Sequence, residues 1–482
     1  MKILLASSEV HPFSKTGGLA DMVGALGKAL ARAGHEVRIV TPLYRGIRER
    51  FPTMQRVDWW FDLPLGANRV PADLFSLEVE KGMTVYFIRQ PEFFDRDGIY
   101  LEHDVSYADN AGRFVFFSKC VTQLARFLPW RPDVVHVHDW QTALVPALML
   151  LQKHLEGWWN PPGTCLTIHN LAYQGIFPPD AFALTNLPPE FFTVEGAEFY
   201  GQMNCLKAGI VFADAITTVS PRYAREITTE EFGCGLDDQL RRRQNRLFGI
   251  LNGVDCDEWN PASDPFLPRA YSATRLAGKT ANKLALQNEL GLPPAKTVPL
   301  FGTISRLAEQ KGVDIQLGAL EEMLSADLQF VLLGSGSAAY ERGYQGLARR
   351  FPNQVAVRLG YDEGLAHRIE AGCDFYLMPS RYEPSGLNQM YSLRYGAIPI
   401  VRVTGGLDDS VIDFAQDAER ANGIKFQEYS ARALAKAMRK ALFLYQQPEL
   451  LRRCRQNAMK MDFSWEETVG EYVKIYEVTQ MF

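Results

Sequence analysis

The sequence predicts an α/β fold of two tandem doubly wound domains. The chain has 482 residues, too many for one ordinary hydrophobic core. Short apolar runs that favour strands alternate with helical patterns, and this alternation begins anew in the second half. Such alternation is typical of a parallel sheet with helices on both faces. We therefore expect two Rossmann-like domains that face a deep cleft, where strand carboxyl ends and helix N-termini meet a ligand.

The first half carries the elements of an N-terminal doubly wound domain, residues 1–250. Residues 2–7 fit a strand, and residues 19–33 fit an amphipathic helix that stops at Gly34, a residue suited to helix C-termini. The other strands expected here are 36–41, 84–88, 133–138, 164–169 and 215–219. The other helices expected here are 107–128 and 141–153.

The second half carries a C-terminal doubly wound domain, residues 276–460, after a connection at 251–275 that is rich in Asn, Asp, Pro and Trp. Its expected strands are 298–305, 328–333, 355–359, 374–378 and 398–403. Its expected helices are 313–325, 338–351, 364–371 and 386–396. We expect 430–482 to be helical throughout. The last part, 461–482, is a C-terminal helix of the kind that often packs back on an N-terminal domain.

Composition argues against several functional classes. The formal net charge is −5, and the longest basic run, Arg241–Arg243, fits a solvated helix face, so no nucleic-acid partner is expected. No apolar run has the length needed to span a bilayer, so no membrane partner is expected. The seven cysteines are scattered without Cys-x-x-Cys spacing. This pattern predicts reduced thiols, no zinc site and a cytoplasmic location.

A glycine pair follows the first strand, in the segment Lys15-Thr-Gly-Gly-Leu-Ala-Asp21. Gly17 and Gly18 let the backbone approach a ligand closely, and the helix N-terminus offers free N–H groups to an anion. Lys15 adds a positive charge. Taken alone, the segment fits an ordinary glycine turn equally well, and its spacing is not that of a P-loop.

This segment resembles the N-terminal signature of bacterial glycogen synthases and plant starch synthases. The resemblance continues over nearly the whole chain, in motifs that follow in order and at family-like spacing. They are residues 131–140, 167–175, 201–209, 219–227, 251–255, 305–307 with 310–312, 383–387 and 462–465. One such motif would be a weak signal, whereas the ordered series is a strong one.

The resemblance implies a GT-B type fold and a metal-independent enzyme of glycogen biosynthesis. Such an enzyme moves glucose, with retention, from a nucleotide-diphosphate glucose to the non-reducing 4-OH end of an α-1,4-glucan. ADP-glucose is the expected donor and UDP-glucose the alternative; the partner is glycogen or another α-1,4-glucan, and no cofactor is expected. The sequence offers no obvious carboxylate nucleophile. The leaving phosphate is therefore expected to accept the proton of the incoming hydroxyl, while the protein supplies positioning and electrostatics.

The resemblance also implies roles for single residues. Lys15 binds the donor phosphates, Arg306 and Lys311 complete a phosphate clamp, and Glu383 binds the donor glucose. Asp139 and His169 line the donor-glucose pocket. The other residues expected to contact substrate are Glu9 and Tyr100 near the acceptor, Tyr361 stacked on the base, and the motif residues Gly17, Gly18, Asp21, Asn170, Asn252, Ser385, Gly386 and Leu387.

The chemistry of the clamp can also be argued from the residues themselves. A diphosphate leaving group gains negative charge as the glycosidic bond breaks, and fixed cations stabilise that charge most in the transition state. Without their neighbours, Arg306 and Lys311 would more often be solvated surface residues. We expect Lys15 to converge with them on the diphosphate from the opposite side of the cleft. Glu383 lies between a strand that ends at Ser380 and an expected helix from Gly386, where a carboxylate can accept hydrogen bonds from sugar hydroxyls.

Strand ends account for the remaining candidates. Asp139 follows the strand 133–138 and His169 ends the strand 164–169, positions where a parallel sheet presents functional groups. His136 and His138 share one strand face, which suits metal ligation, but no third ligand is evident and no metal is expected. A tyrosine at a strand end, such as Tyr361, is more often a packing residue than a stacking platform.

Two positions depart from related sequences. Many bacterial members have Cys where this chain has Ser385, so no role for a thiol carries over. More distant glycosyltransferases have a second glutamate where this chain has Tyr391, and its absence is normal for the synthases.

Four other interpretations remain open. Residues 334–339 match the dinucleotide fingerprint G-x-G-x-x-A, but the acidic residue expected about 20 positions later is missing. Asp95-Arg-Asp97 and Asp255-Cys-Asp257 resemble the metal-binding pair of single-domain glycosyltransferases, although two strand–helix repeats argue against that class. A non-catalytic glucan-binding protein would not need the three cations and Glu383. A two-domain glycosyltransferase with a different acceptor is the fourth.

Overall fold

The computed structural model describes residues 1–103, 105–155 and 157–480. It contains two compact units, each of which is described by itself. The first comprises residues 1–219 and 224–253 together with the C-terminal segment from Trp465. The second comprises residues 220–223 and 254–464. Within the described residues, no helix is both long enough and apolar enough to cross a membrane.

The first unit is built on a nine-stranded sheet of order β14-β13-β9-β8-β1-β2-β5-β4-β3. Seven of these strands pair in parallel: β1 (Lys2–Ala6), β2 (Glu36–Pro42), β5 (Met83–Arg89), β8 (Val134–His138), β9 (Gly163–Ile168), β13 (Ala215–Thr218) and β14 (Leu247–Gly249). The central strands β1 and β8 are almost wholly buried, because both faces of a parallel sheet are covered by helices. The doubly wound architecture predicted from the sequence is confirmed for this unit.

The main helices of the first unit are α1 (Gly18–Arg32), α4 (Asn110–Phe127), α5 (Val145–Leu155), α6 (Cys205–Phe212) and α17 (Trp465–Thr479). Shorter ones are α2 (Ile47–Arg50), α3 (Pro91–Phe94) and α8 (Asp237–Arg242), while α7 (Pro221–Glu226) has its first three residues in the second unit and the rest in the first. The predicted C-cap of the first helix is confirmed, since Gly34 has the left-handed φ of 89°.

Three strands of the first sheet were not predicted. The long strands β3 (Gln55–Leu65) and β4 (Asn68–Glu80) form an antiparallel hairpin that pairs with β5, and β14 adds a short parallel edge. The hairpin exposes many of its side chains, including Trp60, which lies on the edge strand β3. Its apolar pattern is therefore weaker than that of the buried strands.

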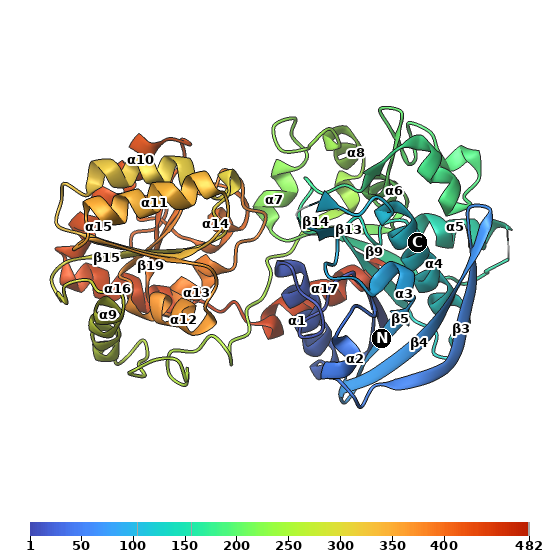
Figure 1. Cartoon of the computed structure of the whole chain (residues 1–482), viewed down its shortest axis with the longest axis horizontal. Coiled ribbons are helices and arrows are strands. Elements are labelled where there is room, and N and C mark those ends of the chain that lie inside the picture. The colour runs from blue at the N-terminus through green and yellow to red at the C-terminus, as the bar shows by residue number, and fades with distance from the viewer. Residues whose placement is uncertain (104, 156, 481–482) are drawn as a thin grey trace. The chain divides into compact units, whose positions relative to one another are not determined.

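The second unit has a six-stranded parallel sheet of order β17-β16-β15-β18-β19-β20. The strands are β15 (Leu300–Ile304), β16 (Gln329–Gly334), β17 (Val355–Leu359), β18 (Phe375–Met378), β19 (Ile398–Arg402) and β20 (Ile424–Phe426). The helices are α9 (Ala277–Glu289), α10 (Val313–Met323), α11 (Ala338–Arg350), α12 (Glu363–Gly372), α13 (Asn388–Arg394), α14 (Gly405–Ser410), α15 (Ala431–Tyr445) and α16 (Pro448–Met459). Helices α10 and α11 lie on one face of this sheet, and α12 and α13 lie on the other (Figure 1).

The strand order reverses at β15, because β16 and β17 follow on one side of it and β18 to β20 on the other. Such a reversal separates the loops that leave neighbouring strands, and open α/β sheets bind their ligands there. A ligand site is therefore expected at the loops that follow β15 and β18.

One prediction about the chain's segments needs correction. Residues 430–482 are not helical throughout, because the chain leaves the helical conformation at 446–447 and again at 460–464. Residues 251–275, which were predicted as the inter-domain connection, are divided between the two units. Up to Gly253 they belong to the first unit, and from Val254 they pack within the second, where buried Tyr271 donates a hydrogen bond to the carbonyl of Tyr395 at 2.7 Å.

Helix α17 belongs to the first unit and is fixed there by a buried hydrogen bond. The hydroxyl of Tyr476 lies 2.8 Å from Nδ1 of His136 on β8, and Nε2 of His136 lies 2.6 Å from Oγ1 of Thr167. Close packing adds to this contact, since a Cβ at Gly163 would lie 2.5 Å from the hydroxyl oxygen of Thr479. A sheet strand and the last helix thus share one polar core.

Tyr476→Phe is expected to destabilise the first unit by about 1–3 kcal/mol, because it leaves a buried ring nitrogen of His136 without a partner. The matched control is Tyr44→Phe in the same unit, since the buried Tyr44 hydroxyl has no partner among the described residues. Urea unfolding of both variants checks this. Equal midpoints for the two would contradict it.

Candidate active site

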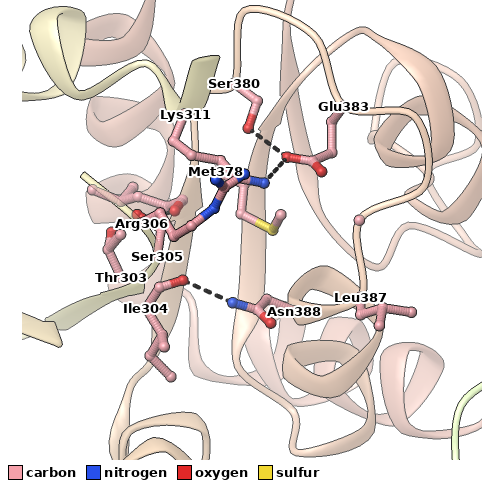
Figure 2. A pocket seen from close by; sticks show the side chains of 12 residues that line it. Thr303, Ile304, Ser305, Arg306, Lys311, Met378, Ser380, Glu383, Leu387 and Asn388 are labelled. Carbon is pink, nitrogen blue, oxygen red and sulfur yellow. Dashed lines mark hydrogen bonds and ion pairs between the residues drawn. The ribbon is translucent and has the colours of Figure 1, made fainter. Parts of the chain in front are cut away.

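The second unit has a cavity of about 220 Å³ at the carboxyl ends of β15 and β18. It is lined by Thr303, Ile304, Ser305, Arg306, Lys311, Leu377, Met378, Ser380, Glu383, Gly386, Leu387 and Asn388 (Figure 2). The lining includes the predicted site residues Arg306, Lys311, Glu383, Gly386 and Leu387. Five residues that were predicted separately from the sequence therefore line one cavity, although they come from two loop regions.

An ion pair forms the polar centre of this cavity. Nζ of Lys311 lies 2.7 Å from Oε2 of Glu383, and Oγ of Ser380 donates to the same oxygen at 3.0 Å. Figure 2 shows both side chains pointing toward the carboxylate. The Glu383 side chain is 8% exposed and that of Lys311 is 20% exposed. Arg306 also lines the cavity, and its side chain makes no ion pair within the described chain. Two cations and one anion leave the cavity with a net positive charge, which suits an anionic ligand.

Close backbone packing sets the position of Lys311. It ends a 3₁₀ turn, η4 (Glu309–Lys311), and the next residue, Gly312, adopts a left-handed φ of 71° before α10 begins. A Cβ on Gly312 would lie 2.1 Å from the carbonyl oxygen of Pro379. Glycine is required here by both conformation and space, and it lets the turn approach the end of β18.

The loop that carries Glu383 is held in a similar way. Cβ atoms at Gly405 and Gly406 of α14 would lie 1.9 Å and 2.0 Å from the carbonyl oxygens of Glu383 and Ser385. The predicted helix start at Gly386 is wrong: α13 begins at Asn388, and Gly386 has a left-handed φ of 64°. Ser385 is buried, and its hydroxyl donates to the carbonyl of Gly386 at 3.3 Å.

Asn388 is a cavity residue that the sequence reasoning missed. Its Nδ2 donates to the carbonyl of Ile304 at 2.7 Å and lies 3.0 Å from the hydroxyl of Tyr376. That hydroxyl also accepts from the N–H of Ile304. Asn388 thereby joins the end of β15 to the start of α13. Its place directly after the motif 383–387 was the signal that could have found it.

Tyr361 lies elsewhere on the second unit. Its side chain is 77% exposed, and it follows Gly360, whose φ is 108°. An exposed aromatic ring after a strand end has the access that base stacking needs.

In the first unit, the carboxylate of Glu9 organises the loop that carries Lys15. The buried Glu9 accepts hydrogen bonds from Oγ1 of Thr16 at 2.7 Å, from the N–H groups of Thr16 and Gly17, and from the hydroxyl of Tyr100 at 2.7 Å. Burial raises the pKa of Tyr100, as does the nearby charge of Glu9, so its phenol stays protonated. Both residues were predicted near the acceptor, and here they hold the loop.

Lys15 itself is half exposed and forms an ion pair with Asp21, whose carboxylate lies 2.8 Å from Nζ. Cβ atoms at Gly17 and Gly18 would meet nothing within 4 Å, and neither glycine has a positive φ. The protein's own packing therefore does not require glycine at these two positions. The open space beside Gly17 and Gly18 instead suits the close approach of a ligand to the backbone.

Asp139 and His169 are in direct contact in the same unit. The N–H of His169 donates to Oδ1 of Asp139 at 2.7 Å, and Nε2 of His169 lies 3.1 Å from Nδ1 of His138. Burial raises the pKa of Asp139 to about 7 and lowers the pKa of His169 to about 3. Asp139 also has a positive φ of 55°, an uncommon conformation for a residue with a side chain. The imidazole is neutral at physiological pH, while the carboxyl group titrates near neutrality.

The two predicted asparagines lie in the first unit as well. Oδ1 of Asn170 accepts from the N–H of Ala172 at 3.0 Å and closes a local turn. Asn252 is buried, and its Oδ1 has no hydrogen-bond partner in the part of the chain that is described. The contact of either asparagine with substrate stays a prediction.

Both Asp-x-Asp pairs have partners within the protein. Arg45 binds the first pair, with Nε 2.7 Å from Oδ1 of Asp95 and a second ion pair to Asp97. In the second pair, Oδ1 of Asp255 accepts from the N–H groups of Asp257 and Glu258 and closes a turn. These contacts give the two motifs structural roles.

Comparison with known proteins shows the family of the chain. The model of the starch synthase catalytic domain matches residues 2–242, and that of group 1 glycosyl transferases matches residues 290–461. Glycogen synthase 2 of Geobacter sulfurreducens is 44% identical over 99% of both chains, and the glycogen synthase of Anaeromyxobacter sp. (strain Fw109-5) is 48% identical over 99% of both. The chain belongs to the glycogen and starch synthase family. It is a glycosyltransferase.

Solved structures agree with this membership. The catalytic domain of starch synthase IV from Arabidopsis thaliana, bound to ADP and acarbose, matches 100% of this synthase-family chain and 99% of its own. Its TM-score is 0.88 at 35% identity. Sucrose-phosphate synthase from Thermosynechococcus elongatus, with a TM-score of 0.60 at 17% identity and coverage of 99% and 98%, shares the fold. The GT-B fold expected from the resemblance is confirmed.

Asp139→Asn is expected to change how stability depends on pH. The folded pKa of about 7 lies above the ordinary value of 3.8, so the folded state holds the proton more firmly. Stability should fall as pH rises from about 4 to about 7, by up to about 1.4 kcal/mol per pH unit, and then level off. Asn cannot titrate and tolerates a positive φ, so the variant loses this decline.

Urea midpoints from pH 4.5 to 8 measure the effect, with the exposed Asp58→Asn as the control. Wild-type and Asp139→Asn curves that stay parallel over this range would contradict the expectation.

Proposed function

We propose that the chain is a glycogen synthase, which transfers glucose from ADP-glucose to the non-reducing 4-OH end of an α-1,4-glucan with retention of configuration. The observation that carries the proposal is the cavity in which Arg306, Lys311 and Glu383 meet at the topological reversal of the second sheet. The bacterial relatives are named glycogen synthases, and the starch synthase IV structure holds ADP and acarbose. These names support both the reaction and the donor.

The cavity supplies positive charge to a leaving diphosphate. Arg306 and Lys311 both line the cavity from the loop after β15, and Lys311 is held there by its ion pair with Glu383. Cations placed in advance where negative charge develops on the phosphate stabilise it with little reorganisation. Lys15 lies just before the N-terminus of α1, where the glycine pair leaves open space, and this is a second setting that suits a phosphate. We assign all three cations to the donor's diphosphate.

The carboxylates have positioning roles in this proposal. Glu383 is already engaged by Lys311 and Ser380, which orients it to accept a hydrogen bond from a sugar hydroxyl. Asp139 is largely buried and binds the backbone of His169, so it is constrained as part of a sugar pocket and is not a free nucleophile. The leaving phosphate then takes the proton of the incoming 4-hydroxyl on the same face, and the protein acts by position and charge. A cytoplasmic location remains a prediction drawn from the scattered cysteines.

Purified protein with glycogen is expected to incorporate glucose with a higher kcat/KM from ADP-glucose than from UDP-glucose. The rate should change less than twofold in excess EDTA, because the cavity supplies cationic side chains to the leaving group. Radiolabelled glucose incorporation measures both. A preference for UDP-glucose would overturn the donor assignment. Loss of activity in EDTA, restored by Mg²⁺ or Mn²⁺, would revive the Asp-x-Asp interpretation.

Lys15→Ala and Lys311→Ala are each expected to lower kcat at least tenfold, with glycogen affinity nearly unchanged. Removing a donor aimed at developing negative charge typically costs on the order of 10²–10³ in kcat. Lys15→Arg should be impaired as well, since a planar guanidinium does not replace a compact ammonium. Steady-state kinetics with varied donor and varied glycogen separate the two effects.

The exposed Lys440→Ala is the matched control. Lys311→Ala also leaves the largely buried Glu383 without its ion pair, whereas Asp21 remains partly solvated after Lys15→Ala. The Lys15 variant is therefore the cleaner test of charge. Normal kcat in both lysine variants would refute the clamp.

A further inference from the structure

A second cluster of ligand-type side chains lies in the second unit, apart from the residues of the cavity. Glu258, Glu363 and His367 each offer one ligand atom, and these atoms lie within 4.8 Å of one another. Glu363 and His367 lie four residues apart in α12 and so share one helix face. Glu258 comes from the segment after Val254, about a hundred positions earlier in the chain. Only the tertiary structure brings the three together.

His367 is the member that points to a ligand. It is 1% exposed, and its Nδ1 lies 2.7 Å from Oδ2 of Asp264. A carboxylate oxygen accepts, so Nδ1 carries a ring hydrogen, and Nε2 is the ring nitrogen left for a ligand. Nε2 is buried and has no hydrogen-bond partner in the described part of the chain. Buried polar atoms are nearly always partnered, so this nitrogen calls for a ligand.

The histidine ring is held rigidly for such a role. The indole of Trp259 stacks on the His367 ring with centroids 3.9 Å apart and planes at 11°. The other face of that indole stacks on Tyr391 at 3.8 Å, and Nε of Arg394 donates to the Trp259 carbonyl at 2.8 Å. An imidazole fixed by stacking and bonded through Nδ1 to a carboxylate is the arrangement that orients metal-binding histidines.

We propose that Nε2 of His367 and the carboxylates of Glu258 and Glu363 bind one divalent transition-metal ion, for which Zn²⁺ is the best match. One imidazole and two carboxylates, with water as a fourth ligand, form a ligand set that Zn²⁺ accepts. Ligand atoms of a tetrahedral zinc site lie about 3.3 Å apart, given bonds of about 2.0–2.1 Å. The exposed side chains of Glu258 and Glu363 can rotate to close that difference while the buried imidazole stays in place.

The role of the ion is structural. It joins the segment that begins at Val254 to the N-terminal half of α12, and none of its three ligands lines the cavity of Arg306, Lys311 and Glu383. Binding therefore stabilises the second unit in proportion to metal concentration, as any ligand of the folded state does. It does not take part in glucose transfer, so the proposal stands apart from the proposed function.

The test is Zn²⁺ binding to the full-length protein after dialysis against chelator and then against metal-free buffer. Titration against a chromophoric zinc indicator is expected to show one site that Glu258→Gln and Glu363→Gln each weaken at least tenfold. Both residues are exposed, so the variants keep the fold. Glu428→Gln, another exposed residue of the same unit, is the matched control and should bind as wild type does.

Thermal unfolding gives the second readout. Zn²⁺ should raise the unfolding midpoint of wild type and of Glu428→Gln, and should raise it less in the two cluster variants. No zinc binding by wild type, or the same affinity in wild type and both cluster variants, would overturn the proposal. Retention of activity in EDTA together with a lowered unfolding midpoint would support it.

Discussion

Close backbone approach at the carboxyl ends of β15 and β18 is the constraint on which the cavity depends. Gly312 makes this approach possible, since a side chain there would collide with the carbonyl oxygen of Pro379. Gly405 and Gly406 of α14, which follows β19, similarly let α14 lie against the loop that carries Glu383. The two loops can therefore lie against each other, with Lys311 on one and Glu383 on the other. A larger residue at any of the three would move a loop, and the ion pair would lose its 2.7 Å contact.

The ion pair between Lys311 and Glu383 neutralises only part of the charge in the cavity, and the charge that remains can bind an anion. Lys311 offsets the charge of Glu383, which would be costly to bury alone. Arg306 then leaves an excess positive charge beside a polar, oriented carboxylate. An anionic diphosphate and a neutral sugar need these two features side by side. In a small, partly closed cavity such charges act more strongly than they would in water.

The first unit uses buried polar groups in a different way. The carboxylate of Glu9 accepts a hydrogen bond from the backbone of the Lys15 loop, and that of Asp139 accepts one from the backbone N–H of His169. These acids fix the ends of strands and the start of α1, so residues that look like substrate ligands in the sequence also build the site. Burial of the Asp139 carboxyl group raises its pKa, because the charged form is poorly solvated there. The same unit keeps α17 in place through the contact between His136 and Tyr476.

The sequence by itself determined most of the parallel strands, the doubly wound halves and five of the residues that line the cavity, because apolar periodicity and short motifs are local properties. It also carried signals that were overlooked, such as Pro448 at the first position of α16, which begins a new helix inside the stretch 430–482. The tertiary structure alone decided the β3–β4 hairpin, whose partly exposed strands are stabilised by pairing with β5. It also decided the left-handed backbone conformation of Gly386, after which α13 begins only at Asn388. It also decided the meeting of Glu258 with His367. Contacts between residues far apart in the chain depend on packing, and packing leaves no periodic trace in the sequence.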